Sequence, residues 1–413
     1  MTANGFTRGL IVSLIEEFCN FPLENLIVYT NWLNLSVIEL PSPAAPDRQG
    51  VAGSTKFKEL LQNFIAHSRS HAMPLAKSMV FSVLLVLTGI CYAQTEPQPI
   101  NELPNPYRTV RDWAQPPGPA PWAAVTAIEM APDGGIYVIH RCSGNSCAGR
   151  TEPPILKFDK TGKLLKSWGE GLFVFPHGAT VDAQGNLWVT DSQTQNGKGG
   201  QVFKFNADGK VLMTLGKAGV ASAEPGLFDE PTDVAIAANG DIFVTEGHSG
   251  GTAGNDRISK LSKDGKFIKS WGKKGSGQNE LDAPHTIAID SRGRLVVGDR
   301  NNNRIQIFDQ DGRYIATWRQ FGRPSGIAIM RDDTIYVADS ESWGPDQPGW
   351  KKGIRIGSAR DGSVKYFIED MESTTIDHSG AEGVGVDAEG NVYGGVVRRQ
   401  MLEKHIPQTS REK

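Results

Sequence analysis

The stretch Gln184-Gly185-Asn186-Leu187-Trp188-Val189 is one of six related copies that run down this chain of 413 residues. Each copy is a polar turn followed by a β-branched or aromatic run, which is typical of a β-hairpin. Successive turns lie 51, 55, 53, 40 and 57 residues apart, counted at Gly134, Gly185, Gly240, Gly293, Asp333 and Gly390. A period of this length is typical of propeller blades, which bury their hydrophobic faces only by stacking in a ring. The sequence therefore predicts an all-β fold, a six-bladed β-propeller with four-stranded blades.

The last blade lacks a fourth strand of its own. Its third strand is predicted over residues 401–405, and no further strand is predicted after it. Near the start of the repeat region, residues 107–113 have the pattern of a spare outer strand. We expect this strand to pair with the last blade and close the ring, because closure leaves no open sheet edge. The propeller is assigned to residues 94–413.

The N-terminal part of the chain has a different composition. Residues 80–90 form an apolar run that follows Lys77 and precedes Cys91-Tyr92-Ala93. A basic segment, a short apolar core and a small-residue cleavage site predict a signal peptide over residues 73–93. We expect Met73 or Met79 to be the true start, which makes residues 1–72 a spurious extension. The alternative is a genuine cytoplasmic tail on a membrane-anchored protein.

Charge and cysteine content favour a secreted or periplasmic globular domain. The net charge is −3, with no basic stripe, so no nucleic-acid partner is expected. The apolar run is too short for a transmembrane helix, so no stable membrane insertion is expected after signal cleavage. Cys142 and Cys147 are the two cysteines of the mature chain, separated by four residues. In an oxidising compartment they are predicted to form a disulfide.

The repeat register places a candidate metal site at one mouth of the central channel. The position eight residues before each turn opens the innermost strand of its blade, and it holds Thr126, His177, Thr232, His285, Ser325 and Glu382. Ligand-capable side chains therefore occupy alternate blades, from which they converge on the channel axis. Two histidines and a carboxylate with an open position are typical of catalytic zinc, although iron and manganese accept the same ligands. The sequence predicts Zn²⁺ on His177, His285 and Glu382.

A second register adds candidate catalytic residues at the same mouth. Seven residues after the turn, the second strand holds Arg141 in the first blade and Arg300 in the fourth. Guanidinium groups hold carboxylates in bidentate fashion, so a small-molecule or peptide substrate with a carboxylate is expected. His248 lies beside this register and is a candidate for proton transfer. The alternative for the arginines is pairing with acidic residues of the blades, and for His248 simple solvation.

The residues around these positions resemble a known family. The phrases Phe175-Pro176-His177-Gly178, Ala283-Pro284-His285-Thr286, His140-Arg141 and Asp299-Arg300 are similar to the NHL-repeat propellers. More narrowly, they resemble the peptidyl-α-hydroxyglycine α-amidating lyases. The similarity covers most of residues 120–397.

This resemblance implies a zinc lyase that splits a hydroxyglycine-extended peptide into an amide and glyoxylate. In the family, three histidines hold the zinc, two arginines face the substrate and a tyrosine acts as a base. His177 and His285 match two of the ligands, and Arg141 and Arg300 match the arginines. Glu382 replaces the third histidine, and His248 occupies the tyrosine position. Gly383 replaces an aspartate that binds calcium in the family, so no calcium is expected there.

Three functional interpretations follow. The first is a secreted metal-dependent lyase of this kind. The second is another metal-dependent propeller enzyme, such as a lactonase-like hydrolase that uses a metal-bound water as nucleophile. The third is a non-catalytic propeller that binds a ligand or a protein, because propellers serve many functions.

Overall fold

The computed structural model divides the chain into two compact units, Met1–Glu96 and Pro97–Lys413. It describes residues 98–118, 121–248, 255–342, 347–375 and 378–408, and the backbone of residues 26–31 and 34–39. In the first unit, β1 (Leu26–Asn31) pairs antiparallel with β2 (Asn34–Glu39), within the predicted extension. The predicted signal peptide over residues 73–93 lies outside the described residues. Among the residues that are described, no helix is long and apolar enough to cross a membrane.

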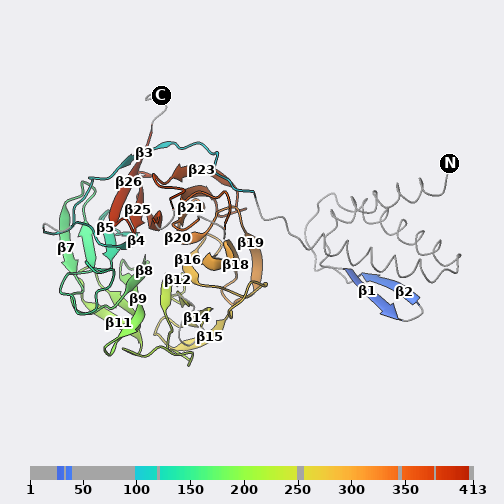
Figure 1. Cartoon of the computed structure of the whole chain (residues 1–413). Coiled ribbons are helices and arrows are strands. Elements are labelled where there is room, and N and C mark those ends of the chain that lie inside the picture. The colour runs from blue at the N-terminus through green and yellow to red at the C-terminus, as the bar shows by residue number, and fades with distance from the viewer. Residues whose placement is uncertain are drawn as a thin grey trace. The chain divides into compact units, whose positions relative to one another are not determined.

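The second unit is a six-bladed β-propeller of four-stranded antiparallel sheets, arranged in a ring (Figure 1). Blade one consists of β4 (Val125–Met130), β5 (Ile136–His140), β6 (Ile155–Phe158) and β7 (Leu164–Trp168). Blade two consists of β8 (Pro176–Val181), β9 (Leu187–Gln195), β10 (Lys198–Phe205) and β11 (Val211–Gly216). Blade three consists of β12 (Pro231–Ile236), β13 (Ile242–Glu246), β14 (Arg257–Leu261) and β15 (Phe267–Trp271). Blade four consists of β16 (Pro284–Ile289), β17 (Leu295–Asp299), β18 (Arg304–Phe308) and β19 (Tyr314–Trp318). Blade five consists of β20 (Pro324–Ile329), β21 (Thr334–Asp339), β22 (Gly353–Ser358) and β23 (Val364–Glu369). Blade six consists of β24 (Ala381–Val386), β25 (Val392–Val396), β26 (Met401–Pro407) and β3 (Tyr107–Val110). A short 3₁₀ helix, η2 (Arg300–Asn302), follows β17. The predicted fold class is confirmed.

The turns of the repeated phrase are stabilised by their own polar side chains. In blade two, Asp182 Oδ1 accepts hydrogen bonds from the backbone N–H groups of Gln184 and Asn186, at 3.0 and 2.9 Å. Gly185 sits between them with a φ of +81°, a conformation that is strained for any residue with a side chain. Trp188 Nε1 donates to Asp182 Oδ2 at 3.0 Å, which fixes the first aromatic residue after the turn.

The sixth blade takes its outer strand from the other end of the domain. β3 pairs antiparallel with β26, with Tyr107 opposite Pro407 and Val110 opposite Lys404. The pairing ends three residues earlier than the 107–113 predicted from sequence. Trp113 instead packs against Tyr393 and Phe158, with ring centroids 5.0 and 6.0 Å apart. Packing of this half-buried indole therefore takes the place of further strand pairing.

All six innermost strands have an irregularity in strand pairing just after their first residue, where the pairing register shifts. The residues left without a regular pair include Thr126, His177, Thr232, His285, Ser325 and Glu382. A β-bulge bends its strand and re-aims the side chain it carries. The six positions that the sequence singled out are therefore displaced from the regular pleat at the same point of each blade.

Neighbouring innermost strands come very close where blade two meets blade three. A Cβ on Gly178 would lie against Asp233 Oδ1 and 2.5 Å from the main-chain oxygen of Thr232. We expect Gly178→Ala to lower the free energy of unfolding by about 1–3 kcal/mol, because the obstruction includes backbone that cannot rotate away. Denaturant unfolding measures the change.

Gly144→Ala is the matched control for this prediction. A Cβ there would meet only the end of the Arg150 side chain, which can move. Its expected effect is within about 0.5 kcal/mol. Equal losses in the two variants would show that the close approach at Gly178 is not what limits that position.

Candidate functional site

Two buried histidines face each other across one mouth of the channel. His177 is the second residue of β8, and His285 is the second residue of β16; they are 2% and 1% exposed. Their Nε2 atoms lie 3.1 Å apart. His177 Nδ1 lies 2.8 Å from the main-chain oxygen of Thr232, and His285 Nδ1 lies 2.7 Å from that of Ser325.

These contacts determine the tautomers. A carbonyl oxygen only accepts, so each Nδ1 carries the proton and each Nε2 presents a lone pair. Two lone pairs facing each other at 3.1 Å repel unless a cation lies between them. Two nitrogen ligands at about 2.0–2.1 Å from a tetrahedral zinc ion are about 3.3–3.4 Å apart. The arrangement therefore suits metal binding, and the carbonyls of Thr232 and Ser325 provide the outer contacts that orient ligating histidines.

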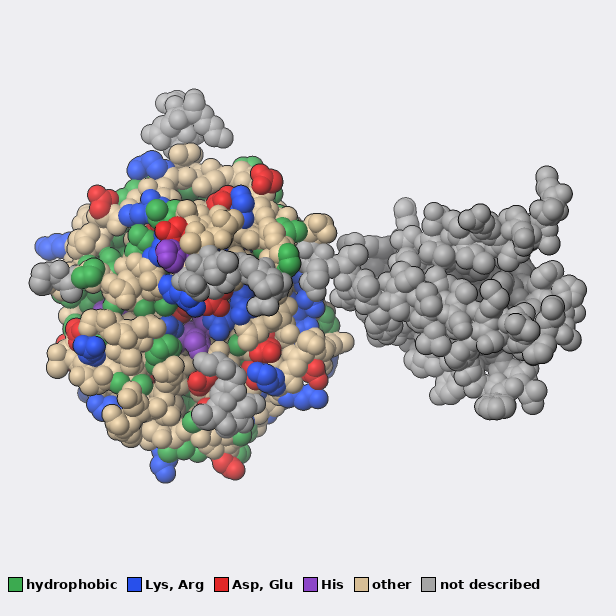
Figure 2. Space-filling model, viewed as in Figure 1, with side chains coloured by type: hydrophobic (Ala, Val, Ile, Leu, Met, Phe, Trp, Pro, Cys, Tyr) green, Lys and Arg blue, Asp and Glu red, His purple; other side chains and the backbone are tan. Residues whose placement is uncertain are grey.

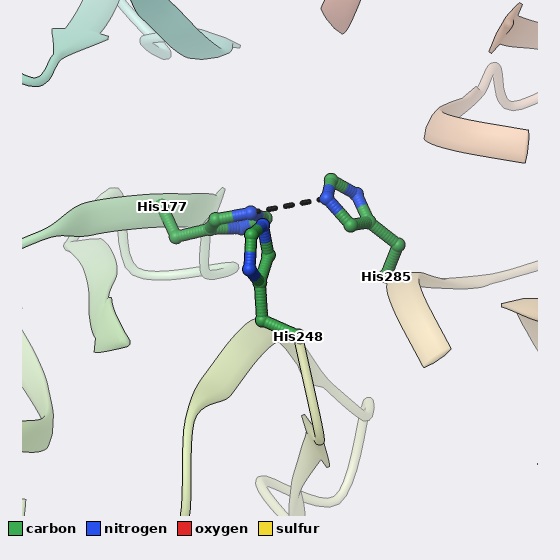
Figure 3. A group of neighbouring side chains, drawn as sticks. All are labelled: His177, His248 and His285. Atoms are coloured by element: carbon green, nitrogen blue, oxygen red, sulfur yellow. Dashed lines mark hydrogen bonds between the residues drawn. The ribbon is translucent and has the colours of Figure 1, made fainter. Parts of the chain in front are cut away.

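His248 is the third histidine of this cluster. One ligand atom from each of His177, His248 and His285 lies within 4.8 Å of the others. The ring centroid of His248 lies 4.7 Å from that of His177 and 5.2 Å from that of His285. The three side chains point toward one another (Figure 3). Unlike the other two, His248 comes from a loop that follows β13. Gly247 precedes it with a φ of +112°, which turns the chain toward the channel.

The environment keeps all three rings neutral. Burial lowers the pKa of His177, His248 and His285 well below 6.5. Positive charge on Arg300 further lowers the pKa of all three, and that on Arg141 further lowers the pKa of His177 and His248. Neutral imidazole is the form that binds metal, so the site is ready to do so at neutral pH.

Glu382 lies beside the cluster but is held by an arginine. Its Oε1 accepts a hydrogen bond from Arg141 Nη2 at 2.9 Å and lies 3.7 Å from His177 Nε2. Both members of the ion pair are buried, at 5% and 3% exposed. Arg141 also stacks over Phe175, with its guanidinium carbon 3.9 Å from the ring centroid. Burial raises the pKa of Glu382, and the charges of Arg141 and Arg300 act against that rise.

Arg300 also lies beside the cluster. It opens η2, is 8% exposed, and donates from Nη2 to the main-chain oxygen of His248 at 3.2 Å. Its Nη1 is 3.8 Å from Glu341 Oε2, an oxygen that also lies 3.5 Å from Arg323 Nε. The face in Figure 2 shows basic, acidic and histidine side chains gathered near the middle of the propeller.

The structure thus brings together all six predicted site residues, with His248 and Glu382 in different surroundings from those expected. The predicted third ligand, Glu382, pairs with Arg141, whereas the predicted proton-transfer residue, His248, joins the two strand histidines. Glu341 and Arg323 were missed. Ser340 lies seven residues after Asp333 and so belongs to the second register, and Glu341 directly follows it. Extending the second register by one residue would therefore have found Glu341.

The predicted disulfide is present beside the site. Cys142 is bonded to Cys147 in the loop that follows β5. Asn145 lies within this loop, and its Oδ1 accepts a hydrogen bond of 3.5 Å from Arg141 Nη1. The disulfide therefore restrains a loop that helps to hold Arg141.

Comparisons with known proteins agree with the repeat and with the family resemblance. A model of the NHL repeat matches residues 281–308, the stretch from just before β16 to the end of β18. Peptidyl-glycine alpha-amidating monooxygenase B of Xenopus laevis is 31% identical over 275 residues, which cover 62% of this chain and 29% of that protein. Peptidyl-alpha-hydroxyglycine alpha-amidating lyase 1 of Drosophila melanogaster is 34% identical over 212 residues, which cover 43% of this chain and 36% of that protein. The chain therefore matches about a third of the length of these relatives.

A solved structure supports the fold alone. An X-ray structure described as that of a gluconolactonase candidate superposes with a TM-score of 0.51 at 13% identity. The match covers 74% of this chain and 93% of that chain.

Proposed function

We propose that this NHL-repeat propeller, which is similar to the peptidyl-α-hydroxyglycine α-amidating lyases, is a metal-dependent lyase that releases glyoxylate from a hydroxyglycine-type substrate. The observation that carries the proposal is the pair of facing Nε2 atoms, 3.1 Å apart, on histidines whose Nδ1 atoms both contact carbonyl oxygens. Two such nitrogen atoms can bind one cation between them, and the pair lies beside two arginines suited to an anionic substrate.

His177, His248 and His285 are the residues that would hold the metal, with Zn²⁺ as the first choice and iron or manganese as alternatives. When bound, the ion supplies Lewis acidity that polarises an oxygen of the substrate. This assignment exchanges the roles that the sequence suggested for His248 and Glu382. The exchange is supported by the ion pair with Arg141, which already occupies Glu382 Oε1.

The reaction is balanced without any oxidant, reductant or water. The carbon–nitrogen bond of the hydroxyglycine breaks, the hydroxyl becomes the aldehyde of glyoxylate, and the nitrogen leaves as a primary amide. Arg300 binds the substrate carboxylate, and Glu382, held in place by Arg141, accepts the hydroxyl proton. The departing amide nitrogen takes up one proton, so the overall proton count is unchanged.

Glyoxylate release from an α-hydroxyglycine-capped peptide tests the proposal. We expect the purified protein to release glyoxylate, a metal chelator to abolish the release, and added Zn²⁺ to restore it. An untreated sample of the same preparation, with metal content measured, is the control. A folded, metal-loaded protein that releases no glyoxylate would contradict the lyase function, and opening of a lactone by that protein would favour the hydrolase.

We also propose a secreted or periplasmic location for this chemistry. The disulfide between Cys142 and Cys147 supports it, because such bonds persist in oxidising compartments.

A further inference from the structure

His248 differs from the other two histidines of the cluster in how it is held. His177 and His285 belong to strands and are oriented through their own Nδ1 atoms. His248 follows Gly247 in the loop between β13 and β14. A ligand on a loop needs contacts from neighbouring elements to keep its position.

Arg300 supplies one such contact from the next blade. Its Nη2 donates to the main-chain oxygen of His248 at 3.2 Å. The arginine itself is fixed at the start of η2, where the N–H of Asn303 donates to its main-chain oxygen at 3.0 Å. Arg300, from blade four, therefore restrains the backbone of blade three at His248.

The same guanidinium has donors to spare. Arg300 Nε is buried and has no hydrogen-bond partner among the described residues. Its Nη1 lies 3.8 Å from Glu341, beyond hydrogen-bonding distance. A buried donor without an acceptor is costly, and a charged N–H group suits a carboxylate oxygen. The unpaired Nε therefore indicates where an anion would bind next to the histidine cluster.

We propose that Arg300 is a positioning residue for His248, and that through it a metal ion and a carboxylate ligand bind cooperatively. This inference rests on the proposed metal site of His177, His248 and His285. A carboxylate at Nε would fix the plane of the guanidinium and so strengthen its hold on the main chain of His248. By linkage, the carboxylate then raises metal affinity by the same factor by which the metal raises carboxylate affinity.

Positioning and simple electrostatics make opposite predictions for Arg300→Gln. Loss of a positive charge near a cation site should raise metal affinity if charge alone mattered. Loss of a residue that positions a ligand should lower it, typically by about 10–100-fold. Arg323→Gln is the matched control, because Arg323 lies beside the same Glu341 oxygen as Arg300 but donates to Asn301. We expect it not to weaken metal binding.

The experiment measures Zn²⁺ affinity of the full chain by competition with a chromophoric chelator. We expect Arg300→Gln to weaken binding at least about tenfold and Arg300→Lys to weaken it less, since lysine keeps a positively charged donor group. In a His248→Ala background, Arg300→Gln should not weaken binding further, because the positioning role acts through His248. Additive effects, or tighter binding in Arg300→Gln, would overturn the positioning role. Circular dichroism checks that each variant is folded.

Acetate is the probe for cooperativity. Saturating acetate should raise Zn²⁺ affinity about fivefold or more in the wild-type protein and not in Arg300→Gln. Equal enhancement in both would mean that acetate ligates the metal directly, which would overturn the coupling through Arg300. Absence of Zn²⁺ binding in the wild-type protein would instead contradict the proposed metal site itself, so the two failures are distinguishable.

Discussion

His285→Ala should remove both bound metal and lyase activity. His285 is 1% exposed, and its Nε2 faces that of His177, so alanine leaves the second histidine with no partner across the channel. Loss of one ligand should weaken Zn²⁺ binding on the order of a hundredfold or more. Glyoxylate release should fall at least about a thousandfold, which corresponds to about 4 kcal/mol of activation free energy. Metal content and steady-state kinetics on the same sample measure both effects.

His405→Gln is the control for removing a buried histidine. His405 lies on β26, 3% exposed, with Nδ1 2.9 Å from Thr109 Oγ1, and it belongs to no metal-binding group among the described residues. We expect this variant to keep its metal and its activity. Retention of activity by folded, metal-free His285→Ala would contradict a metal-dependent reaction.

The propeller could be predicted from sequence because each of its blades repeats the same local signals. Turn residues such as Asp182 and Gly185 act within their own hairpin, so their effect is visible in a short window. The irregularities in strand pairing at the channel mouth were not predictable in this way. They depend on how two strands pair, and no single residue type marks them.

The sequence singled out residues that the structure brings together at one mouth, but it did not predict the surroundings of each. His177 and His285 were found because they share a register, and the closed ring brings that register to one mouth. Arg141 and Glu382 are 241 residues apart in the chain, and their ion pair arises only when blade six meets blade one. The sequence therefore suggested Glu382 as a ligand, since its register position was visible and its partner was not. His248 lies outside the register of the strand histidines, which hid its place in the cluster.

Glu382→Gln separates the two assignments of the third ligand. If His248 is the third ligand and Glu382 accepts the proton, the variant should keep its metal while kcat falls about 10²–10⁴-fold. If Glu382 is the ligand, metal affinity should fall together with activity. Glutamine preserves the shape of the side chain but removes the charge that balances buried Arg141. The free energy of unfolding should therefore also fall, by about 3–5 kcal/mol.

Glu403→Gln is the matched control. Glu403 is a buried carboxylate on β26, and its Oε1 pairs with Arg111 Nε at 2.8 Å. Arg111 is 42% exposed at its side chain, so water can solvate it when the pair is broken, and the expected loss of stability is within about 1 kcal/mol. Metal content, kcat and denaturant unfolding should be measured on all three proteins. A Glu382→Gln variant that keeps full kcat would exclude Glu382 as proton acceptor. A variant that loses its metal would return Glu382 to the ligand set and leave proton transfer to His248.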